Sequence, residues 1–327
     1  MEKPLFDLKN LAIMITDKCN LDCYHCFRED YKNDKEFDNE LTKELVNFVK
    51  TTSIDYLRIT GGEPFLYKNL LSVVEAFSNI NITTSIVSNG TLSTDSKLYK
   101  LRKVGLSEIW FSVHSLNEST HDYLTGKTNT LKKLESSIKS SVKYNIKTNI
   151  YLPVSYKNMA EVVETLKWLD NLKVNRIKII KMTPLGKAIP YKFIHVTDTD
   201  WLNFIESIKN LNISVASLKI QGVHSSDKIP RCTILPLRHL NIDTDGRIYP
   251  CCLISGNQQF AIGLISDIHK KGYLNNLALK AKEIMIKHGS FPCLKSTREK
   301  GCPLFSEEIN LLSKEKLAVT KYKCNAG

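Results

Sequence analysis

Residues 16–26 read Thr-Asp-Lys-Cys-Asn-Leu-Asp-Cys-Tyr-His-Cys, which places three cysteines, Cys19, Cys23 and Cys26, within eight positions. The mostly apolar residues 8–15 come before them and are predicted to form a strand buried on both faces. Thiolates this close in sequence can converge on one soft metal centre. Three ligands are one short for a four-iron cluster, so a coordination position would stay open for a substrate or cofactor.

Zinc and disulfide bonds are the two alternative uses of these cysteines. A structural zinc site normally takes four protein ligands, commonly from two CxxC-like pairs, so three cysteines in one loop fit it poorly. Disulfide frameworks are typical of secreted proteins, and the residues Met1-Glu2-Lys3-Pro4 do not resemble a signal peptide. The nine cysteines of the 327 residues are therefore predicted to be thiols or metal ligands in a reducing cytoplasm.

Composition narrows the choice of partners. No apolar run has the length of a membrane span, so no membrane partner is expected. A net charge of +12 would suit nucleic acid, an acidic peptide or a phosphorylated substrate. The lysines are scattered, as in residues 132–147, and are not interleaved with aromatic residues in one stripe. Solvated helix faces are therefore favoured, and nucleic acid is disfavoured.

Strand-like and helix-like segments alternate after the cysteines. Strands are predicted over residues 54–60, 83–87, 109–113, 148–152, 177–181 and 213–218. Helices are predicted over residues 39–52, 69–77, 95–104, 128–144, 159–169 and 198–211. This alternation predicts an α/β fold with a parallel sheet, in the form of a partial (β/α)6 TIM-like barrel. Residues 1–220 would form the barrel and residues 221–327 a small cysteine-rich domain.

Polar motifs follow several of the predicted strands, at the sheet edge where such folds carry their chemistry. The residues Gly61-Gly62-Glu63-Pro64 combine two glycines, which allow a ligand to approach the backbone, with a carboxylate and a rigid turn. Alone, this motif is better explained as an ordinary turn at the end of a strand. Polar residues at the next strand ends are Ser88, Asn89, Ser112 and His114, and plain strand-end polarity explains them as well as ligand binding does.

Six further cysteines lie after residue 230. Residues 237–242 and 247–249 are predicted to form a hairpin around Thr244-Asp245-Gly246, because Asp-Gly suits a tight turn. The hairpin would bring Cys232 and Cys251 together at its open end. Four thiolates could close a second cluster with no open position: Cys232, Cys251, Cys293 and Cys302, with Cys252 or Cys324 as possible substitutes. Buried thiols that act as small hydrophobic residues are the alternative.

The CxxxCxΦC spacing with aromatic His25 at Φ, followed one unit later by Gly61–Pro64, resembles the signature of the radical S-adenosylmethionine (radical SAM) enzymes. The resemblance implies a [4Fe-4S] cluster held by Cys19, Cys23 and Cys26. The amino and carboxylate groups of SAM would chelate its fourth iron. Reductive cleavage of SAM would then give a 5′-deoxyadenosyl radical that abstracts hydrogen from a substrate.

The same resemblance implies which residues contact SAM. They are His25, Gly61, Gly62, Glu63, Pro64, Ser88, Asn89, Ser112, His114 and Met182. The Gly61–Pro64 turn would bind the amino group, and Ser88 with Asn89 would contact the ribose and carboxylate. Residues 182–186 would pack the adenine, although simple apolar packing explains Met182 equally well. The pattern assigns no catalytic residue.

Residues 8–190 are also similar to the GTP 3′,8-cyclases of molybdenum-cofactor biosynthesis, through residues 58–70, 124–126 and 182–186. Toward the C-terminus, the C-x13-G-x4-C pattern from Cys232 to Cys251 resembles the start of SPASM and twitch extensions. Twitch, with one auxiliary [4Fe-4S] cluster, fits better because the CxxCx5CxxxC continuation of SPASM is absent. The cyclases would show CxxC-x13-C and a terminal Gly-Gly, which this chain lacks.

The expected function is oxidation or cross-linking of a ribosomally made peptide, with flavodoxin or ferredoxin as reductant. A separate leader-peptide-binding protein is an expected partner, because the barrel starts near residue 8. One alternative is dehydrogenation or rearrangement of a small metabolite such as a sugar, aminocyclitol or nucleotide, including GTP-cyclase-like chemistry. Another is an iron–sulfur sensor without turnover, which would have no need of the SAM-binding turn at Gly61–Pro64.

Overall fold

The computed structural model describes residues 6–28, 34–182, 184, 186–209, 211–215, 217–221, 237–288, 308–310 and 319–320. Seven consecutive strands run parallel and pair in chain order. They are β1 (Phe6–Met14), β2 (Tyr56–Thr60), β3 (Thr83–Ser88), β4 (Glu108–Ser112), β5 (Lys147–Val154), β6 (Arg176–Lys181) and β7 (Ser217–Gln221). The mixed α/β fold with a parallel sheet is therefore confirmed.

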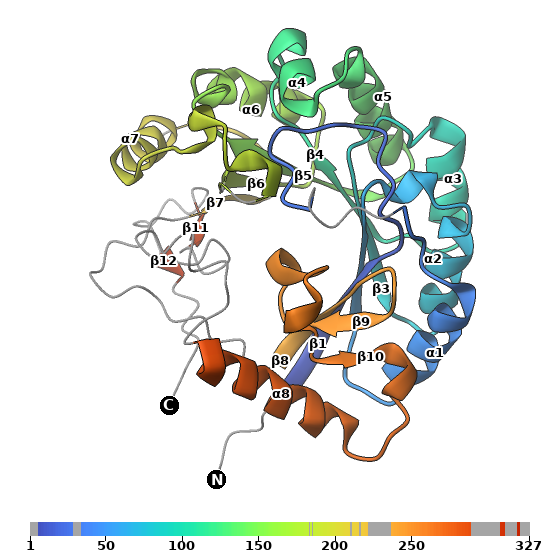
Figure 1. The fold of residues 1–327 in the computed structure, drawn as a ribbon. Helices are drawn as coiled ribbons and strands as arrows, with labels where there is room; N and C mark the ends of the chain where they lie inside the picture. Colours follow the sequence, from blue (N-terminus) through green and yellow to red (C-terminus); the bar gives the residue numbers. More distant parts are fainter. Residues whose placement is uncertain are drawn as a thin grey trace.

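Helices connect these strands and lie on the outer side of the curved sheet (Figure 1). They are α1 (Asn39–Val49), α2 (Leu70–Ser78), α3 (Asp95–Lys103), α4 (Glu118–Thr125), α5 (Thr130–Lys143), α6 (Val162–Asn171) and α7 (Asp198–Ile208). Local sequence sets several of the helix starts. The Asp38 side chain accepts from the backbone N–H of Glu40 at the start of α1, and Asn117 caps α4 in the same way.

The two faces of the strands differ in chemistry. In β2, Leu57 and Ile59 are fully buried and belong to the main apolar core, whereas Tyr56, Arg58 and Thr60 alternate with them and are half-buried. Because successive side chains of a strand point to opposite faces, the first set packs toward the helices and the second lines the concave face. The core thus lies between sheet and helices, and the concave face, called the lumen below, is left for polar groups.

The C-terminal segment adds strands to both edges of this sheet. Strand β8 (Leu237–Ile242) pairs parallel with β1, and β9 (Arg247–Tyr249) and β10 (Gly263–Leu264) follow it antiparallel. At the other edge, β11 (Glu308–Asn310) pairs with β7 and β12 (Val319–Thr320) with β11. Helix α8 (Tyr273–His288) lies beside β8 and β1 (Figure 1).

The structure refines several predicted elements. The hairpin of residues 237–249 has the predicted bounds, but β8 is also a member of the barrel sheet, a pairing that local sequence does not encode. Helix α4 was not predicted, and β7 begins four residues later than expected. The division into domains at residue 220 stays a prediction. No helix among the described residues is long and apolar enough to cross a lipid bilayer.

Candidate functional site

The loop that carries Cys19, Cys23 and Cys26 is held by backbone hydrogen bonds to three separate segments. The N–H groups of Gly62 and Glu63 donate to the carbonyls of Thr16 and Lys18, at 2.7 and 2.8 Å. Farther along, Asp22 and Tyr24 donate to the carbonyls of residues 125 and 124, and the N–H of residue 187 donates to the carbonyl of Cys26 at 3.0 Å. The structure therefore gathers around this loop the segments near residues 62, 125 and 186 that the sequence singled out.

Two of these contacts require glycine. A Cβ atom on Gly62 would lie 2.2 Å from the carbonyl oxygen of Lys18. Gly126 has φ +69°, and a Cβ there would lie 2.4 Å from the carbonyl oxygen of Asp22. Because the atoms in the way belong to the backbone, the cysteine loop could not lie this close to its neighbours if either residue had a side chain.

Glu63 is completely buried and accepts three hydrogen bonds. Its Oε1 accepts from the Ser88 hydroxyl at 2.8 Å and from the Phe65 N–H at 3.1 Å, and its Oε2 accepts from the Asn89 N–H at 2.8 Å. Burial outweighs these bonds and raises the pKa of Glu63 to about 7. The carboxylate therefore ties the end of β2 to the end of β3.

Ser88 and Asn89 are engaged within the protein. The Ser88 hydroxyl donates to Glu63 and accepts from the N–H of Gly90. Asn89 donates through Nδ2 to Asn20 in the cysteine loop, and its Oδ1 accepts from Thr91. These bonds position the cysteine loop against β3. One hydrogen on Asn89 Nδ2 is left for a ligand, so contact between Ser88 or Asn89 and SAM stays a prediction.

Three histidines lie together beside the cysteine loop. The rings of His25 and His114 meet edge to face at 4.6 Å between centroids, and His121 lies 5.3 Å from His114. Burial lowers the pKa of His25 and of His121 to about 4, so both rings are neutral near pH 7. Nδ1 of His25 and Nδ1 of His114 are buried without a hydrogen-bond partner among the described residues. His25 and His114, which were predicted separately as SAM contacts, thus lie in contact, and His121, which the sequence did not single out, packs against His114.

Three further predicted SAM contacts, Met182, Pro64 and Ser112, lie in different environments. Met182 is buried in a small apolar cluster with Leu124, Ala188 and Ile194, which agrees with the packing alternative. Pro64 is buried at the start of a short 3-10 helix. Ser112 is half-buried at the end of β4, in register with Tyr151. None of these positions shows a ligand-specific feature, so their roles stay predictions.

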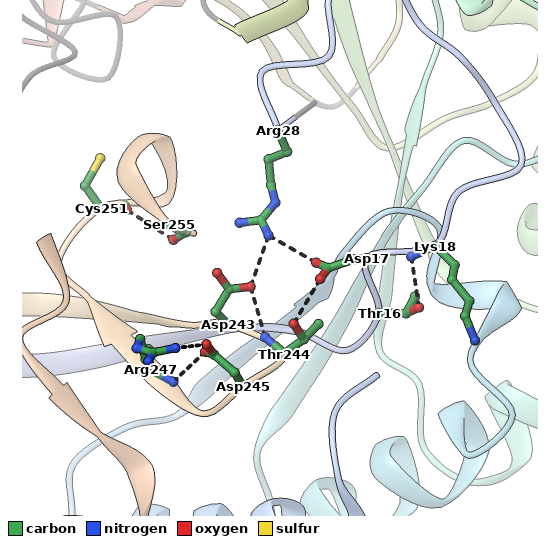
Figure 2. A network of polar contacts seen from close by, with 10 residues as sticks. All are labelled: Thr16, Asp17, Lys18, Arg28, Asp243, Thr244, Asp245, Arg247, Cys251 and Ser255. Carbon is green, nitrogen blue, oxygen red and sulfur yellow. Dashed lines mark hydrogen bonds and ion pairs between the residues drawn. The ribbon is translucent and has the colours of Figure 1, made fainter. Parts of the chain in front are cut away.

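A buried polar network ties the cysteine loop to the C-terminal hairpin (Figure 2). Arg28 Nη2 donates to Asp17 Oδ1 at 3.1 Å and to Asp243 Oδ1 at 3.0 Å. The Thr244 hydroxyl donates to Asp17 Oδ2 at 3.1 Å. Asp17 and Arg28 bracket the three cysteines, and Asp243 and Thr244 form the turn after β8. We call these four residues the Arg28 clasp; sequence reasoning missed it, because its halves are more than 200 residues apart.

The donor set of the cysteine loop fits a soft metal centre. Cys19, Cys23 and Cys26 are half-buried and form no disulfide bond in the described structure. No group of three His, Cys, Asp or Glu side chains in the described part of the chain is already arranged around a metal position. The loop therefore supplies three thiols from a fixed backbone, and the ligand assignment stays a prediction.

Of the second predicted cluster, the structure describes one ligand. Cys251 is buried directly after β9, and Cys252 is half-buried next to it. In Figure 2 the Cys251 sulfur and Ser255 lie on the same side of the hairpin as the Arg28 clasp. Cys232, Cys293, Cys302 and Cys324 lie outside the described residues, so the auxiliary site stays a prediction.

Part of the chain matches a known protein family and curated proteins. Residues 13–169 match the family described as the Radical SAM superfamily. A probable GTP 3′,8-cyclase from Saccharolobus islandicus is 30% identical over 184 residues, which are 55% of this chain and 58% of that relative. The chain thus spans little more than half the length of this relative.

Solved structures with the same fold have lower sequence identity. Native anSMEcpe with bound AdoMet and Kp18Cys peptide gives a TM-score of 0.69 at 19% identity, covering 96% of this chain and 92% of that chain. Streptococcus suis SuiB bound to precursor peptide SuiA gives a TM-score of 0.66 at 16% identity, covering 83% and 66%. At these identities the likeness shows a shared fold.

Proposed function

We propose that this protein, whose residues 13–169 match the Radical SAM superfamily, abstracts hydrogen from a substrate held in the barrel lumen. The observation that carries this proposal is the convergence of the cysteine loop, the Gly61–Pro64 turn and the end of β3, joined through Glu63 and Asn89. Three cysteine ligands on one loop would leave the fourth iron of a [4Fe-4S] cluster open for another ligand, and the resemblance to radical SAM enzymes implies that this ligand is SAM.

Each group of residues has a separate role in this proposal. Cys19, Cys23 and Cys26 would hold three irons, and the carbonyls of Gly61 and Gly62 would accept hydrogen bonds from the ligand amino group. When bound, the [4Fe-4S] cluster and SAM supply the 5′-deoxyadenosyl radical. The protein would position the ligands and exclude water from the strand ends, where the rings of His25 and His114 are in contact and neutral.

Peptide oxidation or cross-linking is the first substrate class that we propose. It is supported by SuiB and anSMEcpe, which share the fold and were solved with peptides. A reductant such as flavodoxin or ferredoxin and a separate leader-peptide-binding protein would be the partners. We place the enzyme in the cytoplasm, because its nine cysteines suit a reducing compartment.

A second substrate class, a small polar metabolite, is favoured by the lumen itself. Its inward-facing residues on β2, β4 and β5 include Arg58, Trp110, Asn149 and Tyr151. Such a lining is unlike the layers of branched apolar residues that fill most barrels of this kind. The lumen could therefore hold a small polar molecule as readily as a peptide side chain.

Anaerobic reconstitution tests the proposal. Protein loaded with iron and sulfide should release 5′-deoxyadenosine from SAM only when a reductant is present. Deuterium transfer from labelled candidate substrates into 5′-deoxyadenosine would then identify the substrate class. Bound iron without any SAM cleavage would overturn the proposal in favour of an iron–sulfur sensor.

A further inference from the structure

The lumen contains a group of buried polar atoms that have no hydrogen-bond partner among the described residues. They are Arg58 Nε, Ser85 Oγ, Trp110 Nε1 and Asn149 Oδ1. Arg58 is opposite Ser85 in the β2–β3 pairing, and Trp110 is opposite Asn149 in the β4–β5 pairing. All four residues therefore face the concave side of adjacent strands. Buried atoms of this kind are costly to leave unpaired, which indicates that a ligand with hydrogen-bonding groups enters the lumen.

Two arginines reach this region from strands that are not neighbours. Arg58 is opposite Ser85 on β3, and Ser85 is opposite Glu108 on β4, so the β2 guanidinium is on the same face of the sheet as Trp110. Tyr151 stacks on Trp110 with 4.4 Å between ring centroids. The Arg176 guanidinium of β6 lies 5.9 Å from the centroid of Trp110. Arg58 and Arg176 therefore share the concave face, and the strands between them carry the stacked pair Trp110 and Tyr151.

The carboxylates nearby do not neutralise these arginines. Among the described residues, the arginines in ion pairs are Arg28 and Arg247. Glu108, which also faces the lumen, is engaged by Lys147 at 3.2 Å and by the Tyr56 hydroxyl at 3.4 Å. Arg58 and Arg176 therefore give this part of the lumen an excess of positive charge. Both side chains are half-buried and have no ion-pair partner among the described residues, so an anionic ligand would offset their charge.

We propose that the lumen binds an anionic group of the substrate, a carboxylate or a phosphate, between Arg58 and Arg176, with Trp110 Nε1 as a neutral donor. Guanidinium groups present paired donors that match both anions. Arg58 lies three residues before Gly61, so the anion would be bound about 10 Å along β2 from the SAM-binding turn. This inference deepens the proposed function and rests on it for the identity of the bound molecule as substrate.

Binding of simple anions to the apoprotein tests the inference without a cluster or SAM. Inorganic pyrophosphate and succinate are titrated separately into the full chain by isothermal calorimetry at low ionic strength. We expect saturable binding of at least one probe at one site per chain. Binding of pyrophosphate alone would assign a phosphate, and binding of succinate alone a carboxylate.

Variants locate the site. Arg176→Met should weaken binding of the active probe at least ten-fold, and Arg58→Met should do the same. Lys43→Met removes an exposed cation from α1 and should leave the affinity unchanged. Trp110→Phe keeps the ring and removes only Nε1, so it should weaken binding less, by about three-fold. Thermal unfolding of each variant shows whether it has kept its fold.

The inference is overturned if neither probe gives saturable binding, or if Lys43→Met weakens binding as much as Arg176→Met does. Failure of the proposed function would look different. Apoprotein could bind the probe at Arg58 and Arg176 while reconstituted protein failed to cleave SAM. Conversely, SAM cleavage with no anion binding would retain the radical SAM assignment and reject the anion site.

Discussion

Glu63 is the single side chain that joins the most parts of the candidate site, because its two oxygens accept from Ser88, Asn89 and Phe65. Glu63→Gln replaces one acceptor oxygen by an NH2 group that would face a backbone donor. We expect the variant to lose about 1–3 kcal/mol of unfolding free energy, measured by urea denaturation of the apoprotein at pH 7.5. Glu75→Gln on the exposed face of α2 is the matched control and should change little. Equal stability of both variants would contradict this role.

The buried histidine His121 should make the stability of the protein depend on pH. The pKa of His121 falls from 6.5 to about 4 on folding, because the buried ring is hard to charge. Between pH 4 and pH 6.5 the unfolded chain binds a proton at His121 that the folded chain does not bind. The contribution of His121 to the free energy of unfolding is therefore fully present above pH 6.5 and is lost as the pH falls toward 4. It amounts to about 3 kcal/mol.

His121→Asn removes this titration while keeping an acceptor for the His114 N–H, which now donates to His121 Nδ1 at 3.3 Å. We expect the variant to lose less stability than the wild type between pH 6.5 and 4.5, as measured by urea denaturation across that range. Exposed His269→Asn is the control and should follow the wild type. Parallel pH curves for all three proteins would show that His121 does not titrate as described.

Some residues of the site could be predicted from the sequence and others could not. Cys19, Cys23, Cys26 and the Gly61–Pro64 turn were recognisable because their chemistry depends on local spacing. Arg58 and Arg176 were not given a role, although charged residues inside strands of an otherwise apolar parallel sheet are a usable signal of a polar lumen. His121 had no such signal, since only the fold brings α4 beside the end of β4.

The elements that hold the cysteine loop depend on the Arg28 clasp. Arg28 lies between two carboxylates, and all three side chains are less than a tenth exposed. Arg28→Met would leave Asp17 and Asp243 facing each other without a cation. We expect a loss of about 3–5 kcal/mol in unfolding free energy, together with faster hydrogen exchange in the turn after β8.

Relieving the repulsion should rescue part of this loss. Adding Asp17→Asn and Asp243→Asn to Arg28→Met removes both charges and should restore part of the stability. Arg102→Met on α3 is the surface control. If the triple variant were no more stable than Arg28→Met, the clasp would not act through charge.

The spacing of apolar residues predicted most of the helices and strands. The elements and pairings that it did not predict have a physical reason. The strands β2 to β6 and the hairpin of β8 and β9 have strong local patterns of apolar residues and turns. The pairing of β8 with β1 joins residues more than 200 positions apart, so the hairpin was expected only within a separate domain. Helix α4 has only eight residues and a weak apolar face, so its sequence shows no clear helical periodicity.

At the scale of the whole molecule, the iron content decides whether the C-terminal cysteines hold a second cluster. With two [4Fe-4S] clusters the reconstituted chain should bind about eight irons, and with one about four. Cys251→Ser should lower the count by about four if Cys251 ligates the auxiliary cluster. An unchanged count of about four in both proteins would remove the auxiliary cluster and leave the cysteine loop as the site of all bound iron.

The most direct measurement is reductant-dependent cleavage of SAM by the anaerobically reconstituted protein and by a variant with Cys19, Cys23 and Cys26 all changed to Ala. We predict that the wild type releases 5′-deoxyadenosine, and that the variant loses about four irons and all of this activity. Cleavage that survives in the variant, or wild-type protein that holds zinc at these cysteines and leaves SAM intact, would contradict the account.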